Sequence, residues 1–171
     1  MIRRHPSDYV DVPSSPYLKS KKVKVWGLIS ITGVQNLIMY EGNLDGSEYS
    51  KILREVFGPI KDTFKKKKYL FMQDNAPAHK SLIVKETLLE LGIQNLPWPP
   101  QSPDLNPIEN VWSIVKQKLW ERRNEIESNE DAQRLIKGIW YSIPKEFIEY
   151  LYRSLPDRNG KLFHVNGQKV S

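Results

Sequence analysis

Hydrophobic and polar positions in the first third of the chain follow the pattern of a β-hairpin and then of a helix. Residues 22–31, "KVKVWGLISI", alternate well enough for a strand, Thr32 and Gly33 favour a turn, and residues 34–42, "VQNLIMYEG", supply the partner strand. A helix that ends at a Gly-Pro pair is predicted by apolar residues at helical spacing: Tyr49, Ile52, Leu53, Val56 and Phe57.

The middle of the chain has the order strand, helix, strand. Residues 69–72, "YLFM", form a short apolar run without charge, which predicts a strand buried on both faces of a sheet. The next helix is marked by Val84, Leu88 and Leu91, and a short strand is predicted at residues 93–97, "IQNLP". Prolines fix the backbone of the following segment, "WPPQSPDLNP", and so predict a rigid loop. This order predicts an α/β fold.

The helix after that loop is the best-marked element of the sequence. Asn106 is a favourable N-cap, Pro107 takes the first helical position, and Glu109 stands at the capping-box position. Its apolar stripe is Ile108, Val111, Trp112, Val115 and Leu119. Two more stripes predict helices around Ala132, Leu135, Ile136, Ile139 and Trp140, and around Phe147, Ile148, Leu151 and Leu155. We expect all three stripes to form core.

Two acids stand at positions where an active site could be built. Asp74 comes just beyond the carboxyl end of the predicted strand at residues 69–72, and open α/β sheets bind ligands at such ends. A turn is the alternative for Asp74, because Asp also accepts a hydrogen bond from the backbone two residues on. Helix capping is the alternative for Glu109. The two acids are separated by 34 residues that span one helix, one strand and the loop.

Composition limits the kind of metal site that this chain could contain. Cysteine is absent and the three histidines are widely spread, which excludes a disulfide framework and argues against a zinc cluster. Two carboxylates suit Mg²⁺ or Mn²⁺, which prefer oxygen ligands. Two such ions about 3.5 to 4 Å apart can activate water and stabilise the leaving oxygen in phosphodiester cleavage.

The net charge of +6 is concentrated before Asp74. Residues 1–68 carry 13 Lys and Arg against 7 acids, with clusters at 19–24 and 61–68. Phosphate backbones are the commonest polyanions that such clusters bind, although a lysine run is also found on ordinary solvated surfaces. The DNA contacts that we predict from this charge are Lys65, Lys66, Lys67 and Lys68.

No apolar run approaches the roughly 20 residues of a membrane span, and the start lacks the core of a secretory signal, so we expect a soluble intracellular protein.

Three segments carry a family resemblance. "FMQDNAPAHKS", "WPPQSPDLNPIENVWSIVKQKL" and "VKVWGLISITGV" closely resemble the catalytic domain of mariner-superfamily DDE transposases, whose signatures run Q-D-N-A-P-x-H and W-P-x-x-S-P-D-L-N-P-I-E-x-x-W. The resemblance extends from about Arg3 to the C-terminal tail. It implies a ribonuclease-H-like α/β fold, in which helices flank a mixed sheet that brings two Asp and one Glu around Mg²⁺ or Mn²⁺.

The resemblance also implies roles for individual residues. Asp74 would be the family's second catalytic and metal-binding Asp, and Glu109 its Glu. Asn75, His79 and Asn106 match motif positions as well, and we expect them to support the geometry of the site and the path of the DNA. The implied activity is metal-dependent phosphodiester hydrolysis and strand transfer in DNA transposition. The implied partners are DNA, at transposon ends and target, and a homodimer is compatible with the family; in a eukaryotic host the protein would be nuclear.

The sequence departs from the family pattern at its amino end. Nothing matches the family's helix-turn-helix modules, and the strand that would end in the first catalytic Asp is not found. Asp8 and Asp11 lie in a Pro/Ser-rich region that predicts turns, so neither is a convincing substitute. We therefore expect residues 1–171 to be a single catalytic domain that lacks its first strand. The alternative function is a catalytically inactive relic or a non-enzymatic DNA-binding protein.

Overall fold

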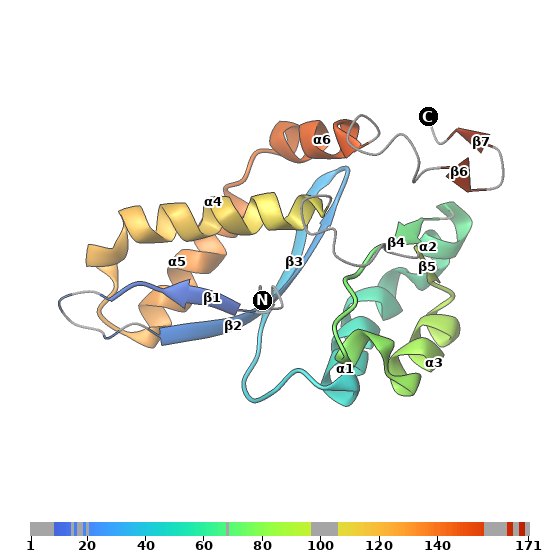
Figure 1. Cartoon of the computed structure of the whole chain (residues 1–171), viewed down its shortest axis with the longest axis horizontal. Coiled ribbons are helices and arrows are strands. Elements are labelled where there is room, and N and C mark those ends of the chain that lie inside the picture. The colour runs from blue at the N-terminus through green and yellow to red at the C-terminus, as the bar shows by residue number, and fades with distance from the viewer. Residues whose placement is uncertain are drawn as a thin grey trace, which may run out of the picture. The chain divides into compact units, whose positions relative to one another are not determined.

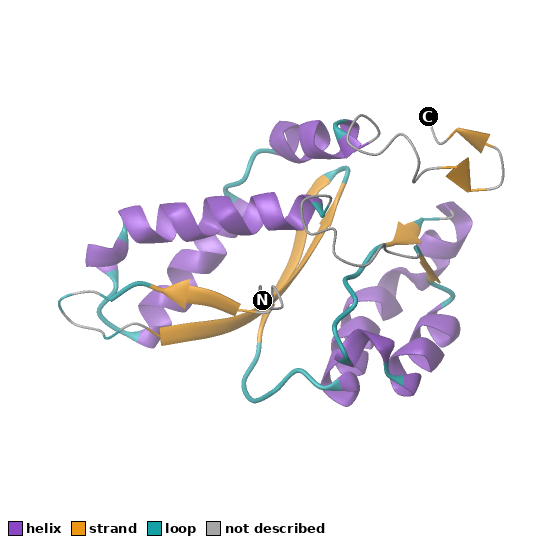
Figure 2. Cartoon of the chain, viewed as in Figure 1, coloured by secondary structure: helices purple, strands orange, loops and turns teal. Residues whose placement is uncertain are grey.

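In a computed structural model the chain forms two compact units of helices and short strands (Figures 1 and 2). The structure describes residues 9–14, 16, 19, 21–67, 69–96, 106–155, 164–165 and 168–169. Of these, residues 40–96 belong to one unit, which contains Asp74 and is called the Asp74 unit below. Residues 9–39 and 106 onward belong to the other, called the hairpin unit. Each unit is described by itself.

The hairpin unit is built on three antiparallel strands in the order β1 (Tyr9–Val12), β2 (Lys21–Ser30) and β3 (Gly33–Met39). The first four residues of β2 pair with β1, and its remainder pairs with β3. Gly33 begins β3 with a φ of 120°, a backbone conformation that glycine adopts without strain. The predicted hairpin is therefore confirmed, with its strands shifted by one to a few residues.

Three helices complete the hairpin unit: α4 (Pro107–Glu121), α5 (Asn129–Tyr141) and α6 (Lys145–Arg153). A 3-10 turn, η4 (Arg123–Glu125), follows α4. Helix α4 packs on β1 and β2, whereas α5 and α6 pack on β3. The three predicted stripes supply most of the buried core of this unit, including Val111, Leu119, Ile136 and Ile148, each fully buried. The stripes are thus core, as expected.

The Asp74 unit contains α1 (Gly46–Phe57), α2 (Lys61–Lys67) and α3 (Leu82–Leu91), with short 3-10 turns η1 (Gly58–Ile60) and η2 (Ala78–Lys80). Its strands β4 (Leu70–Phe71) and β5 (Gln94–Asn95) pair in parallel. Helices α1 and α3 pack together, and a buried hydrogen bond of 2.6 Å joins Ser50 Oγ to Thr87 Oγ1 across them. The hydrogen bond between the two hydroxyls offsets the cost of removing them from water, so the pair can be buried in the helix interface.

The strand before Asp74 differs from its prediction. Strand β4 has two residues, and the prediction that residues 69–72 are buried on both faces was wrong, because Tyr69 is 43% exposed and Leu70 41% exposed. Phe71 alone is buried, with its ring 5.2 Å from that of Phe57 on α1. An apolar run of four residues therefore contributes a single side chain to the core.

Strand β1, helix α2 and a strand pair near the C-terminus were not expected from the sequence. Asp11 lies in strand β1, so its assignment to a turn region was wrong, although its side chain is exposed; Asp8 lies outside the described residues. Helix α2 occupies part of the lysine cluster, whose single buried residue is Phe64. Near the C-terminus β6 (His164–Val165) and β7 (Gln168–Lys169) form an antiparallel pair. Among the described residues no helix has the length and hydrophobicity that a membrane crossing requires.

Candidate catalytic site

Asp74 stands three residues after the end of β4, and its carboxylate shapes the turn that follows. The backbone N–H of Ala76 donates a hydrogen bond of 2.9 Å to Asp74 Oδ1. This is the turn that was considered as the structural role of Asp74, and it is confirmed. The bond fixes the direction of the carboxylate at the strand end, so the turn and a ligand-binding role are compatible.

His79 is the second group that holds the Asp74 carboxylate. Its Nδ1 lies 2.7 Å from Asp74 Oδ1 and 3.3 Å from the carbonyl oxygen of Asp74. The His79 side chain is 14% exposed and that of Asp74 36% exposed, so the imidazole lies deeper than the carboxylate. The prediction that His79 supports the geometry around Asp74 therefore agrees with its position. The carboxylate faces solvent with its Oδ1 held by two nitrogen atoms.

Tyr49 of α1 contacts both His79 and Gln73, the neighbour of Asp74 in the chain. Its ring centroid is 4.2 Å from that of His79, at an interplanar angle of 36°. Its hydroxyl donates a hydrogen bond of 2.8 Å to Oε1 of Gln73, the residue before Asp74. From the sequence Tyr49 was one member of an apolar helix stripe, and helical periodicity contains no signal for a contact with residues 24 and 30 positions away.

A surface pocket of about 540 Å³ opens beside these groups within the Asp74 unit. Asp74, Asn75 and His79 line it on one side, and Leu88 and Ile93 line its apolar part. Lys80 and Lys85 also line the pocket and make it attractive to anions. Asn75, predicted as a supporting residue, thus lies at the same pocket as Asp74.

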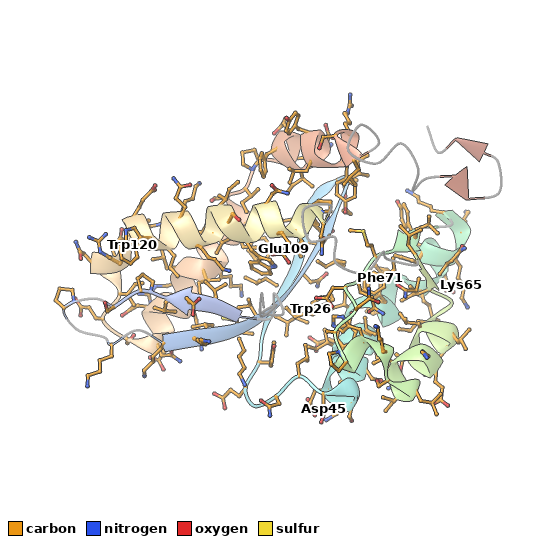
Figure 3. The ribbon with its side chains drawn as sticks, viewed as in Figure 1. Trp26, Asp45, Lys65, Phe71, Glu109 and Trp120 are labelled. Atoms are coloured by element: carbon orange, nitrogen blue, oxygen red, sulfur yellow. The ribbon has the colours of Figure 1, made fainter. Side chains whose placement is uncertain are left out.

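Glu109 and Asn106 stand at the start of α4 in the hairpin unit. Asn106 is the N-cap, and its side-chain oxygen accepts a hydrogen bond of 3.4 Å from the backbone of Ile108, as predicted. Glu109 lies in the first turn and is partly buried (Figure 3). Because Asp74 and Glu109 belong to different units, their convergence stays a prediction.

The donor chemistry around Asp74 fits a hard divalent cation. A carboxylate whose orientation is fixed by neighbouring N–H groups is the arrangement that metal-binding carboxylates show in proteins. In the part of the chain that the structure describes, no group of three His, Cys, Asp or Glu side chains could hold a metal by itself. Asp74 therefore presents one oriented carboxylate, and a metal site that included it would need further ligands.

The lysines predicted to contact DNA are largely on the surface of α2. Lys65, Lys66 and Lys67 are exposed, while Lys68 lies outside the described residues. Lys67 also approaches the ring of Tyr69, with its Nζ 6.0 Å from the ring centroid. Exposed lysines and an exposed aromatic ring are side chains of the kinds that nucleic-acid-binding surfaces use.

Comparison with known proteins assigns the chain to a family. Residues 6–133 match the family described as "DDE superfamily endonuclease". The Tc1 transposase of Caenorhabditis elegans is 33% identical over 146 residues, which cover 85% of this chain and 52% of that protein. The chain therefore spans about half the length of the curated relatives that it matches.

Solved structures of a transposase have a fold similar to that of this chain. The Mos1 transposase catalytic domain, solved with raltegravir and Mg, matches with a TM-score of 0.72 at 22% identity, covering 95% of this chain and 82% of that one. The Mos1 paired-end complex with the left transposon end matches with a TM-score of 0.69 at 20% identity, covering 100% and 51%. The predicted ribonuclease-H-like fold of the mariner type is thus confirmed.

Proposed function

Because the chain belongs to the DDE superfamily endonuclease family, we propose that it is the catalytic part of a DNA transposase and that Asp74 and Glu109 bind its divalent metal. The observation that carries the proposal is the Asp74 carboxylate, which stands beyond a strand end with its Oδ1 held by Ala76 N and His79 Nδ1. This carboxylate belongs to the segment matched by the family. A similar catalytic domain has been solved with Mg, and Mg²⁺ or Mn²⁺ suits an all-oxygen site.

In this proposal some residues bind the metal and others orient the metal ligands. Asp74 and Glu109 supply the anionic oxygens, and His79 keeps the Asp74 carboxylate in one direction. Asn106 fixes the first turn of α4, from which Glu109 projects. When bound, the metal activates water for phosphodiester hydrolysis and stabilises the charge on the leaving oxygen. We expect Asn75, which lines the pocket beside Asp74, to contact the DNA strand.

The proposed substrates are transposon-end DNA and target DNA, to which a freed 3′ hydroxyl is joined. A similar Mos1 structure contains a left transposon end, and the Tc1 relative is a transposase. The exposed lysines of α2 would contact phosphates without reading sequence, since lysine interacts with phosphate as a point charge. A homodimer and a nuclear location, which the family resemblance implies, remain predictions.

This function can be tested in a chimera, in which the Tc1 transposase supplies the regions that this chain does not match. This chain replaces the matching segment of the Tc1 transposase, which retains its remaining regions, and cleavage of Tc1 ends is measured with Mg²⁺. We expect cleavage that Asp74→Asn and Glu109→Gln each reduce at least about a hundredfold, since the bound metal contributes several kcal/mol to charge stabilisation. Glu55→Gln, which removes an exposed carboxylate of α1, should leave the rate unchanged.

Two results would contradict the proposal. One is cleavage that persists in the Asp74→Asn chimera. The other is a chimera that folds and binds Tc1 ends, yet leaves them uncut in Mg²⁺ and in Mn²⁺.

A further inference from the structure

Tyr49 occupies a buried position whose contacts lead to Asp74 through two independent routes. Its side chain is 1% exposed. Its ring lies 4.2 Å from the His79 ring, and its hydroxyl donates to Gln73 Oε1 at 2.8 Å. His79 contacts the Asp74 carboxylate and Gln73 is joined to Asp74 by the chain, so both partners of Tyr49 adjoin the same acid.

We propose that Tyr49 is a positioning residue of the catalytic site, which holds His79 in the orientation that fixes the Asp74 carboxylate. This inference rests on the proposed role of Asp74 as a metal ligand. It adds a residue of helix α1 to the groups that hold the Asp74 carboxylate.

The orientation of the His79 ring requires a support on its face. An imidazole can rotate about its side-chain bonds, and a rotation would carry Nδ1 away from Asp74 Oδ1, which it meets at 2.7 Å. The Tyr49 ring covers one face of the imidazole and is itself prevented from turning by its hydrogen bond to Gln73. Tyr49 is buried on helix α1, so its ring has little freedom to move. A ring held in this way restricts His79, and His79 in turn restricts the Asp74 carboxylate.

The proton position on His79 follows from this arrangement. A bond between His79 Nδ1 and a carboxylate oxygen needs the proton on Nδ1, so neutral His79 should be the Nδ1-protonated tautomer. Tyr49 would therefore determine which nitrogen of His79 carries the proton. That state can be read from the ¹⁵N signals of the ring in the absence of metal.

The test measures the ring nitrogens of His79 in the full chain without metal. In the wild type we expect the proton on Nδ1. Tyr49→Leu should abolish this preference, because the ring that supports His79 is lost. Tyr49→Phe keeps the ring beside His79 but loses the hydrogen bond to Gln73, so it should lose part of the preference. Phe57→Leu is the matched control, since Phe57 is 1% exposed on the same helix and its ring packs against Phe64 and Phe71.

An unchanged Nδ1 signature in folded Tyr49→Leu would overturn the proposal, as would an equal loss in Phe57→Leu, which would indicate a general loosening of the helix. If Tyr49→Leu does not fold, Gln73→Leu replaces it, because it removes the acceptor of the Tyr49 hydroxyl. A Gln73→Leu chain with wild-type His79 signals would likewise contradict the proposal.

Titration with Mn²⁺ alone separates this inference from the proposed function. We expect Tyr49→Leu to raise the Mn²⁺ dissociation constant about tenfold, the low end of the effect of outer ligands on metal affinity, with Phe57→Leu unchanged. A wild-type chain that binds no Mn²⁺ at Asp74 would contradict the metal role in the proposed function. The ring-nitrogen result, obtained without metal, would still decide whether Tyr49 positions His79.

Discussion

At Gly27, the backbone of strand β2 lies close to the indole rings of Trp112 and Trp140. A Cβ atom at this position would lie 2.6 Å from Trp140 Cη2 and 2.8 Å from Trp112 Cζ2. The two rings have centroids 4.8 Å apart, and both residues belong to the buried core of the hairpin unit. Glycine is therefore required at this point of the Trp-Gly strand because the helices α4 and α5 approach its backbone closely.

Replacing Gly27 by alanine should destabilise the protein by about 1 to 3 kcal/mol, the usual cost of forcing extra atoms into a packed core. Urea unfolding of Gly27→Ala against the wild type measures this loss. Gly138→Ala is the control, because a Cβ there meets nothing within 4 Å and the position is inside α5. It should stabilise the helix by about 0.5 to 1 kcal/mol. Equal effects of the two substitutions would refute the steric explanation.

At the scale of single residues, the sequence singled out Asp74 and Glu109 as candidate metal ligands, but it did not show which contacts orient the Asp74 carboxylate. The position of Asp74 beyond a strand end was readable from an apolar run followed by a motif. Its contact with His79 was not, because five residues of loop can fold in many ways. Tyr49 was assigned to the core by its periodicity, which predicts burial and is silent about the partner across the interface.

At the scale of elements, helix α6 is joined to strand β2 by a tyrosine. The hydroxyl of Tyr152 donates a hydrogen bond of 3.2 Å to the carbonyl oxygen of Ile29. Burial raises the pKa of Tyr152 from its usual 10.0 to about 12, because the phenolate would lose its hydration. A phenolate would also be unable to donate to Ile29, so the docking of α6 depends on the neutral form.

This pKa shift predicts a loss of stability at high pH. Unfolded Tyr152 ionises near pH 10 and folded Tyr152 near 12, so its contribution is complete below pH 10 and is lost progressively between these values. The free energy of unfolding should fall by up to about 2 kcal/mol more in the wild type than in Tyr152→Phe over that range. Tyr150→Phe, which changes a 62% exposed tyrosine of the same helix, should behave as the wild type. If all three proteins show the same pH dependence, Tyr152 is not the group responsible.

The helices and the hairpin were predictable because each has a clear hydrophobic period and good end signals. The Asn106 cap and the Ile108 to Leu119 stripe of α4 are examples, and both are confirmed. Helix α2 was missed because its seven residues have Phe64 as their one buried side chain among lysines, which leaves no stripe to detect. Strand β4 was predicted too long and too buried, since local hydrophobicity does not reveal that Tyr69 and Leu70 remain at the surface.

At the scale of the whole molecule, the uneven distribution of positive charge predicts which surface binds DNA. The excess of positive charge lies in residues 1–68, and Lys65, Lys66 and Lys67 are exposed on α2. Changing these three to Glu should weaken binding to DNA of any sequence. It should also make the slope of log K against log salt less steep. Each lost phosphate contact contributes about 0.9 to this slope, and up to about three contacts would be lost.

A gel-shift titration at several salt concentrations measures both effects. The matched control changes three exposed lysines outside that region, Lys116, Lys137 and Lys145, to Glu and alters the net charge by the same amount. If the control weakens binding as much as the α2 variant, net charge rather than a local surface attracts the DNA.

We propose that Asp74 and Glu109 bind one divalent ion, although they belong to two compact units. The most direct test is an NMR titration of the chain with Mn²⁺, which broadens the signals of nuclei near the bound ion. We predict that the backbone amides of Asn75 and Asn110 broaden together at the same Mn²⁺ concentration, and that Asp74→Asn or Glu109→Gln weakens the broadening of both. Broadening that is confined to Asn75 and unaffected by Glu109→Gln would contradict a metal site shared by the two acids. Glu109 would then have only a structural role, in the first turn of α4.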